Sequence, residues 1–304
     1  MGAATATATP GRVWVITGCS SGLGKELALA VLKHNDRVIA TSRNIGRLEE
    51  LRKAGAATLQ LDPNTDLALL RQFADEAINV YGKVDVLVNN AAYVAYGTIE
   101  ETSPEYTLQQ YQTNVFSVLN MSRAFLPHFR SRGTGVIASL GSIGSRLKSP
   151  NMGLYLGTKA ALRSMHLALD LEVRPLGIQT CLIQPGRFRT PLLSSDGDTT
   201  NVRHADSDAA LISAYDKLRS ASIESSKAVH GRQLGDPALG AQRIYEVLTL
   251  SGMAQAKGEI PPELLLGTDA YEATKTILEQ EIKVAEQWRE VSCSTDFQDG
   301  LGVL

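Results

Sequence analysis

Short apolar runs alternate with longer amphipathic stretches along most of the chain. The runs hold four to seven residues, many of them β-branched, and turn residues separate them from stretches with helical spacing. Strands are therefore predicted at 13–17, 37–42, 58–61, 84–88, 135–140, 177–183 and 263–267. Helices are predicted at 25–34, 65–81, 104–132, 153–174, 237–252 and 269–291.

The predicted strands lack a clean two-residue alternation of apolar and polar side chains. Such strands are typical of a parallel sheet that is covered on both faces. Right-handed crossovers then give an α/β fold with a doubly wound parallel sheet of about seven strands and helices on both faces. The longest helix should begin at Ser103 and Pro104, which suit the N-cap and first helical positions.

The alternation of strands and helices stops in residues 191–235, which are polar and rich in turn formers. Weak helical spacing returns at 206–228, and long insertions of this kind are often lids over a site. Residues 292–304 carry little pattern, so a loosely ordered tail is expected there. Nothing resembles a repeat or a Pro/Ser-rich linker, and we expect one catalytic domain over residues 1–304.

Composition limits the classes of partner. The 304 residues are 43% hydrophobic and carry a net charge of −2, which gives no electrostatic case for binding nucleic acid or an acidic membrane. No apolar run approaches the ~20 residues that span a bilayer. The start of the chain lacks the apolar core of a secretory signal, and three cysteines make no disulfide framework. A cytoplasmic protein without a metal site is expected.

Tyr155 and Lys159 are four residues apart on a predicted helix, with Ser142 upstream. Positions i and i+4 share one helix face, so the phenol and the ammonium should project together. A fixed positive charge beside a phenol lowers its pKa, which would suit proton transfer to or from a carbonyl or alcohol. Taken alone, such a pair is usually an ordinary surface contact.

A glycine-rich turn at 17–24 (TGCSSGLG) follows the first strand and opens the first helix. Glycines allow a tight turn and let a phosphate approach the helix N-terminus. Arg43 directly follows the second strand, where no carboxylate is present to hold a free ribose 2′-hydroxyl, so NADP(H) is preferred over NAD(H). Asp62 could accept from an adenine amino group or cap a helix, and Asn90 follows the fourth strand at the cofactor edge.

With these residues the chain resembles the short-chain dehydrogenases/reductases, and the sequence of its motifs is similar to that of fungal members. Each motif is weak alone, but seven in the correct order are specific, and Ser142 precedes Tyr155 by the thirteen residues that the family requires. Position 92 is Ala where the family usually has Gly, position 158 is Thr for Ser and position 141 is Gly for Ser. The resemblance covers about 12–192 and rests on TGCSSGLG, LD (61–62), NNAA (89–92), Asn114, Ser142, YLGTK (155–159) and PGRFRT (185–190).

The resemblance implies a Rossmann-type fold and assigns roles. Tyr155 would be the general acid or base, Lys159 would support it and hold the nicotinamide ribose, and Ser142 would fix the substrate oxygen. Asn114 would hold a water that links Lys159 to solvent; alternatively it is a buried Asn satisfied by backbone. Cofactor contacts are expected from Gly18, Ser20, Ser21, Gly22, Leu23, Gly24, Arg43, Asp62, Asn90, Ala91, Tyr155, Lys159, Pro185, Gly186, the backbone of Phe188, and Thr190.

The expected activity is reduction of a medium-sized ketone with a hydrophobic body, or oxidation of the matching alcohol. Alternatives are non-redox chemistry at the same site (dehydration, epimerisation or cyclisation) and a dinucleotide-sensing module without turnover. In the family, helices equivalent to 104–132 and 153–174 pack against a second subunit, so a homodimer or homotetramer is expected. Substrate contacts are expected from the lid and from Tyr93, Tyr96, Leu147, Met152 and Phe188.

Overall fold

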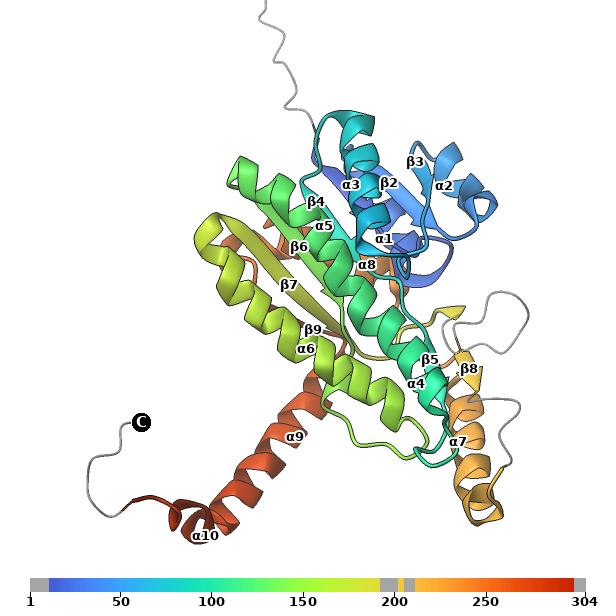
Figure 1. The fold of residues 1–304 in the computed structure, drawn as a ribbon, viewed down its shortest axis with the longest axis vertical. Coiled ribbons are helices and arrows are strands. Elements are labelled where there is room, and N and C mark those ends of the chain that lie inside the picture. The colour runs from blue at the N-terminus through green and yellow to red at the C-terminus, as the bar shows by residue number, and fades with distance from the viewer. Residues whose placement is uncertain (1–10, 192–201, 205–210, 298–304) are drawn as a thin grey trace, which may run out of the picture.

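The computed structural model describes residues 11–191, 202–204 and 211–297. Its centre is a parallel sheet of seven strands in the order β3-β2-β1-β4-β6-β7-β9 (Figure 1). The order runs outward in both directions from β1 and β4, as in a doubly wound sheet, and confirms the predicted fold class. The strands are β1 Val13–Ile16, β2 Arg37–Ser42, β3 Ala57–Gln60, β4 Val86–Asn89, β6 Gly135–Leu140, β7 Ile178–Pro185 and β9 Glu263–Leu266.

Helices cover both faces of this sheet. Trp14 and Ile16 face one helical layer, whereas Val13 and Val15 face the other, because successive side chains of a strand point to opposite sides. Burial on both faces explains the missing alternation in the sequence. The first layer contains α1 Gly22–Lys33, α2 Glu49–Lys53 and α8 Pro237–Thr249; the second contains α3 Leu67–Tyr81, α5 Ser117–Arg132 and α6 Gly153–Val173.

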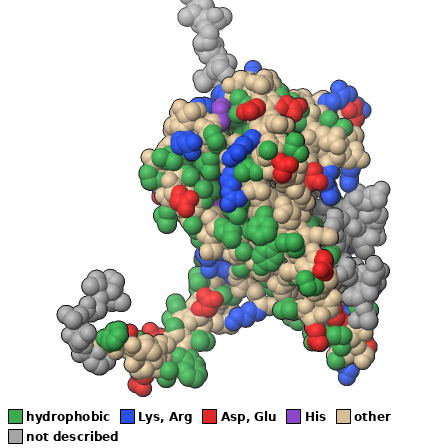
Figure 2. Space-filling model, in the orientation of Figure 1, with side chains coloured by type: hydrophobic (Ala, Val, Ile, Leu, Met, Phe, Trp, Pro, Cys, Tyr) green, Lys and Arg blue, Asp and Glu red, His purple; other side chains and the backbone are tan. Residues whose placement is uncertain are grey.

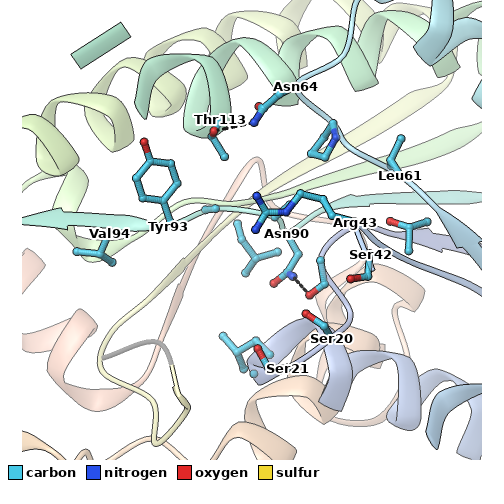
Figure 3. A pocket seen from close by; sticks show the side chains of 18 of the residues that line it. Ser20, Ser21, Ser42, Arg43, Leu61, Asn64, Asn90, Tyr93, Val94 and Thr113 are labelled. Atoms are coloured by element: carbon cyan, nitrogen blue, oxygen red, sulfur yellow. Dashed lines mark hydrogen bonds between the residues drawn. The ribbon is translucent and has the colours of Figure 1, made fainter. Parts of the chain in front are cut away.

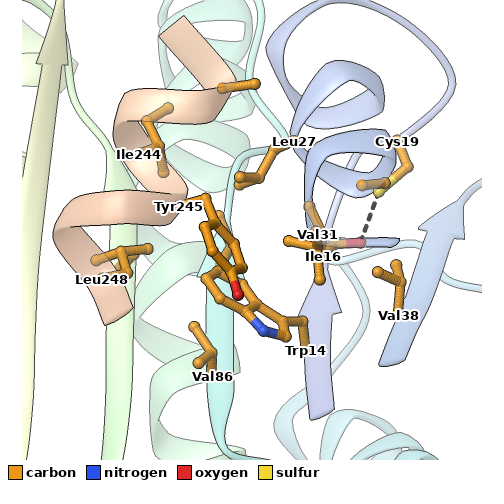
Figure 4. Close-up of a cluster of buried hydrophobic side chains, with 14 of the residues drawn as sticks. Trp14, Ile16, Cys19, Leu27, Val31, Val38, Val86, Ile244, Tyr245 and Leu248 are labelled. Atoms are coloured by element: carbon orange, nitrogen blue, oxygen red, sulfur yellow. Dashed lines mark hydrogen bonds between the residues drawn. The ribbon is translucent and has the colours of Figure 1, made fainter. Parts of the chain in front are cut away.

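A buried carboxylate, that of Asp36, organises the first layer, whose stacked Trp14 and Tyr245 rings are drawn in Figure 4. Asp36 accepts hydrogen bonds from Trp14 Nε1 at 3.1 Å and from the Tyr245 hydroxyl at 3.2 Å. The rings of Trp14 and Tyr245 stack with centroids 5.6 Å apart. This contact joins α8, which comes late in the sequence, to the first strand. The contact thereby holds α8 in the same helical layer that packs beside the glycine-rich turn.

The long helix predicted at 104–132 begins as expected, with Ser103 Oγ accepting from Tyr106 N at 3.1 Å and Pro104 in the first turn. It is not one regular helix, however. A π-helical turn at Gln112–Phe116 separates α4 Pro104–Tyr111 from α5. A π turn admits one extra residue and often occurs at functional sites. Apolar spacing does not reveal such a turn.

Several elements lie outside the main sheet. The small parallel pair β5 Val94–Tyr96 and β8 Val202–His204 was not predicted. Within 191–235 the structure describes α7 Asp216–Val229; residues 192–201 and 205–210 lie outside the described part.

The chain ends in two helices, α9 Thr268–Gln287 and α10 Arg289–Cys293, that stand away from the sheet as an arm (Figures 1 and 2). Of the tail predicted at 292–304, residues 298–304 lie outside the described part. Among the described helices, none is long and apolar enough to cross a membrane.

Candidate active site

A cavity of about 710 Å³ opens at the carboxyl ends of the strands (Figure 3). This is the edge at which doubly wound sheets bind their ligands. Most of the predicted site residues line it, although they come from distant parts of the sequence. These are Gly18, Ser20, Ser21, Gly22, Leu23, Arg43, Asp62, Asn90, Ala91, Ser142, Tyr155, Lys159, Pro185, Gly186 and Thr190.

The glycine-rich turn forms a backbone cradle at the start of α1. Gly18 and Gly22 have φ of 70° and 61°, in the left-handed region that glycine adopts without strain. A Cβ on Gly18 would lie 3.0 Å from the Cα of Ala91, so any larger residue would crowd the neighbouring loop. Ser21 is the N-cap of α1, and its side chain makes no capping hydrogen bond. The turn thus offers backbone donors at a helix N-terminus, which suits a phosphate.

Gly24 is part of the same motif but does not line the cavity. A Cβ there would lie 2.3 Å from Asn90 Nδ2 and 2.7 Å from the carbonyl oxygen of Gly18. Asn90 Nδ2 donates to the carbonyls of Thr17 at 2.8 Å and Gly18 at 3.1 Å. Gly24 therefore makes room for the side chain that holds the turn. The structure gives it a packing role instead of a place in the cavity wall.

The end of β2 carries no carboxylate, as read from the sequence. Arg43 lines the cavity directly after β2, beside Ser42 (Figure 3), and the next residue, Asn44, lines it as well. Asp62 also lines it, and its Oδ1 accepts from the backbone N–H of Asn64 at 3.0 Å. Asp62 therefore closes a turn as well as facing the cavity. The alternative that it caps a helix is wrong, because the N-cap of α3 is Asp66, whose side chain accepts from Leu69 N.

Tyr155 and Lys159 lie on α6 with side chains 8% and 3% exposed, and both face the cavity with Ser142. Lys159 Nζ lies 5.9 Å from the centroid of the Tyr155 ring and donates to the carbonyl oxygen of Leu140 at 2.7 Å. Ser142 Oγ accepts from the N–H of Gly144 at 2.9 Å. The bend after β6 thus holds the serine against the tyrosine.

The predicted lowering of the Tyr155 pKa by Lys159 is wrong for this structure. Burial raises the pKa of Tyr155, and a hydrogen bond from Ser142 only partly opposes that rise. Burial also lowers the pKa of Lys159 to about 8, because a desolvated ammonium is costly. The sequence argument counted the charge of the lysine but could not count the burial of both groups. A phenol in this state is protonated at neutral pH and can act as a proton donor.

Asn114 is fully buried in the π turn and does not line the cavity. Its carboxamide bonds to the main chain of Tyr93, and Nδ2 also donates to Thr158 Oγ1 at 3.2 Å. These contacts agree with the alternative of a buried Asn satisfied mainly by backbone. Thr158, which replaces the usual serine, takes part in this support through its hydroxyl.

Phe188 does not line the cavity either. Its ring packs against α8, where a Cβ on Gly240 would lie 2.5 Å from Phe188 Cε1, and it belongs to the core of the first helical layer. The expectation of a substrate contact from this side chain is therefore wrong. Its carbonyl oxygen accepts from Thr190 N at 2.8 Å. Gly186 and Thr190, on either side of it, do line the cavity.

Of the other expected substrate contacts, Tyr93 lines the cavity (Figure 3). Tyr96 and Met152 do not line it but pack around Tyr155. Leu147 is not in the wall. Sequence reasoning missed the contribution of the long helix, namely Leu108, Gln109, Gln112 and Thr113. This part of the helix mixes polar and apolar residues, and such a mixture does not indicate in the sequence that a segment lines a cavity.

Cys19 lies in the glycine-rich turn and is buried. Its Sγ lies 3.1 Å from the carbonyl oxygen of Ile16, and burial raises the thiol pKa to about 12. Such a thiol is a poor nucleophile. In the described ranges, no group of three or more His, Cys, Asp or Glu side chains is placed to hold a metal ion.

Fold and cavity together define a Rossmann-type oxidoreductase. The chain belongs to the short-chain dehydrogenase family, because the family profile described as short chain dehydrogenase matches residues 12–201. A fungal relative, the oxidoreductase BOA17 of Botryotinia fuckeliana, is 29% identical over 288 residues, or 93% of this chain and 99% of its own. This similarity agrees with the resemblance of the motif sequences to those of fungal members.

Solved structures show the same fold. A short-chain dehydrogenase from Streptomyces avermitilis is 31% identical, with a TM-score of 0.81 over 94% of this chain and 100% of its own. A 3-ketoacyl-(acyl-carrier-protein) reductase from Brucella melitensis, complexed with NADH, is 25% identical. Its TM-score is 0.67, over 86% of this chain and 99% of its own. A similar fold thus binds a nicotinamide dinucleotide in that reductase.

Proposed function

We propose that the protein is an NADP(H)-dependent reductase of ketones with a medium-sized, hydrophobic body. The observation that carries the proposal is that Ser142, Tyr155 and Lys159 share one cavity with the glycine cradle of α1. The turn suits a dinucleotide phosphate, since Gly18, Ser21 and Gly22 line the cavity at the start of α1 and the helix end has no side-chain cap.

In this proposal a bound nicotinamide supplies the hydride, and the chain manages the proton. The hydroxyl of Tyr155 donates its proton to the substrate oxygen as negative charge develops there. Its raised pKa keeps the hydroxyl protonated before that moment. Ser142 donates a hydrogen bond that orients the same oxygen. Lys159, with a pKa of about 8, then returns a proton to the Tyr155 oxygen or stabilises its charge.

The preference for NADP(H) rests on the end of β2. Arg43 lines the cavity there, and Ser42 and Asn44 beside it carry no charge that would repel a 2′-phosphate. A guanidinium binds phosphate through charge-assisted hydrogen bonds. The bound NADH of the Brucella melitensis relative is a property of that protein. The two cofactors should therefore be compared directly on this chain.

The substrate class rests on the mixed wall beyond Tyr155. Tyr93, Val94 and Leu108 supply apolar surface, and Gln109 and Gln112 supply polar groups. The described part of the proposed lid, α7, lies close to this region: Ser226 Oγ is 3.5 Å from the hydroxyl of Tyr96, which packs near Tyr155. The reductase from Brucella melitensis is likewise named for a keto substrate.

A homodimer or homotetramer is part of the proposal. Met165 and Leu171, on the outward side of α6, are 41% and 76% exposed. Large apolar side chains in such positions suit a subunit interface. Sedimentation of the wild type and of Leu171→Glu tests this, with a shift of the variant to monomer expected. A monomeric wild type would refute it.

The test of function is a ketone panel followed at the reduced-nicotinamide absorbance, with NADPH and NADH side by side. Wild type should oxidise NADPH on part of the panel, in a 1:1 ratio with alcohol formed. Tyr155→Phe should lose at least ~10²-fold in kcat, the usual scale of general acid catalysis, and still bind NADPH. Unchanged turnover in Tyr155→Phe would refute the assignment, and product formed without NADPH loss would indicate non-redox chemistry.

A further inference from the structure

A half-buried acid, Glu263, lies outside the cavity wall, at the first position of β9. Glu263 Oε1 accepts from Arg163 Nε at 2.6 Å, and Oε2 accepts from Arg163 Nη2 at 3.0 Å and from Arg146 Nη2 at 3.2 Å. Gln184 Nε2 also donates to Oε1, and Ser145 Oγ donates to the side-chain oxygen Oε1 of Gln184. One carboxylate thus gathers donors from three separate segments, none of which is adjacent to it in sequence.

Each of these segments carries a part of the active site. Arg146 ends the short helical turn Ile143–Ser145, whose N-cap is Ser142. Arg163 lies one turn beyond Lys159 on α6, on the same helix face. Gln184 directly precedes Pro185 and Gly186, which line the cavity. Glu263 itself does not line the cavity, so it acts on the site only through these neighbours.

The geometry is restrictive because the cluster is largely withdrawn from water. The side chains of Arg146, Glu263 and Arg163 are 17%, 19% and 28% exposed. Burial alone would raise the pKa of Glu263, but hydrogen bonds from Arg163 and the charge of Arg146 lower it overall. The paired, planar contact with Arg163 fixes the direction of the carboxylate as well as its distance.

A second acid offers a matched comparison far from the cavity. Asp85, just before β4, accepts from Arg132 at 2.6 Å and from Lys83 at 2.8 Å, with its side chain 16% exposed. It lies at the amino end of a parallel strand, whereas the cavity lies at the carboxyl ends. The two acids are thus alike in burial and in cationic partners but differ in what their partners carry.

We propose that Glu263 is a positioning residue for the catalytic group, holding the Ser142 turn, the α6 face that bears Tyr155 and Lys159, and the end of β7 in mutual register. This rests on the proposed reductase function. When the carboxylate is removed, Arg146 and Gln184 lose their common partner, and the serine turn is free to shift relative to α6. A misplacement of about 1 Å in a catalytic group can cost about 10²-fold in rate.

The kinetic test compares Glu263→Ala with Asp85→Ala. Glu263→Ala should lower kcat about 10–100-fold while the Kd for NADPH changes less than about threefold, because the cradle on α1 is untouched. Glu263→Gln, which keeps an acceptor of the same length, should recover part of the rate. Asp85→Ala should lower the unfolding temperature by a similar amount and leave kcat within about twofold of wild type.

A second readout does not depend on turnover. Amide hydrogen exchange of residues 141–147 should be faster in Glu263→Ala than in wild type, and unchanged in Asp85→Ala. Arg146→Ala, which keeps the Glu263–Arg163 pair, should give the same local change, and it decides the matter if Glu263→Ala does not fold. The proposal is overturned if exchange at 141–147 stays at the wild-type rate. It is equally overturned if kcat of a folded Glu263→Ala stays within twofold. A wild type inactive on every ketone would refute the reductase function, and the exchange experiment would still decide the role of Glu263.

Discussion

Asn114 holds the main chain of Tyr93 through both ends of its carboxamide. Its Oδ1 accepts from Tyr93 N at 3.1 Å, and its Nδ2 donates to the Tyr93 carbonyl oxygen at 2.9 Å. Tyr93 lines the cavity, so a side chain buried in a π turn fixes a wall of the site that it does not itself reach. Asn114 therefore fixes the conformation of the loop that carries Tyr93.

Replacing Asn114 by Ala should therefore weaken both the fold and the site. The N–H of Tyr93 would lose its partner in a buried place, at a cost of about 1–3 kcal/mol in the free energy of unfolding. We also expect a lower kcat/KM, because Tyr93 and Val94 line the cavity. Urea unfolding and steady-state kinetics measure the two effects. Asn120→Ala is the control, since Asn120 bonds only to Arg123 on the outer side of α5 in the contacts described; equal losses in both variants would contradict this role.

Arg43 should decide which cofactor is bound. Arg43→Ala is expected to raise the Kd of NADPH about 10–100-fold, the loss of one charge-assisted contact, and to leave NADH nearly unchanged. Fluorescence titration with both cofactors measures this. Arg52→Ala serves as the control, because Arg52 is exposed and pairs with Glu49 at 2.7 Å, away from the cavity. If NADPH binds Arg43→Ala as tightly as wild type, the proposed preference has another origin.

Arg219 should anchor the described part of the lid. Glu101, with its side chain 3% exposed, accepts from Arg219, from Ile212 N at 2.8 Å and from Thr98 Oγ1 at 2.8 Å. Because α7 contains no buried residue, these polar contacts rather than apolar packing attach it.

Arg219→Ala should raise KM for the ketone about tenfold, the cost of one hydrogen bond to a charged group, with little change in kcat. Steady-state kinetics with NADPH held at saturation measures the effect. Arg232→Ala, an exposed arginine just beyond α7, should behave as wild type. An unchanged KM in Arg219→Ala would show that α7 does not enclose the substrate.

His166 should make the fold sensitive to acid. It is 2% exposed, and burial lowers its pKa from 6.5 to about 4, against the opposing charge of Asp170. Between these pH values the unfolded chain binds a proton that the folded chain does not. The free energy of unfolding should therefore fall as the pH drops from 6.5 to 4, by up to about 3 kcal/mol from this group. Urea unfolding from pH 7 to pH 4 measures the slope. In His166→Gln that share of the slope should vanish, and an identical slope would show that another group carries it.

The sequence predicted the fold well because buried parallel strands have a strong local signature. All seven strands of the main sheet were predicted, and β2 and β6 have the expected bounds. The strands β5 and β8 were missed because three residues each carry too little periodicity. The π turn was missed because it changes the hydrogen-bond pattern without changing the apolar spacing.

At the site, motif residues were found wherever backbone geometry or proton chemistry restricts the residue type. Gly18, Ser142, Tyr155 and Lys159 are of this kind, and all line the cavity. The direction of the Tyr155 pKa shift was wrong, because burial is a tertiary property. The donor cluster around Glu263 was not predicted either, since its partners lie on α6, on the turn after β6 and on β7, which only the tertiary fold brings to the start of β9.

The π turn at Gln112–Phe116 has a consequence for anyone who edits this helix. One additional residue rotates everything after it by about 100° around the helix axis. Because of this rotation, Leu108 and Thr113 line the cavity. Phe125 and Phe129, further along the same continuous helix, pack in the core. Deleting a single residue between 112 and 116 would restore an ideal helix and turn one of these two surfaces the wrong way. The π turn sets the rotation of the segment that lines the cavity relative to the segment that packs in the core. A design that transfers either segment to another protein must therefore include this turn.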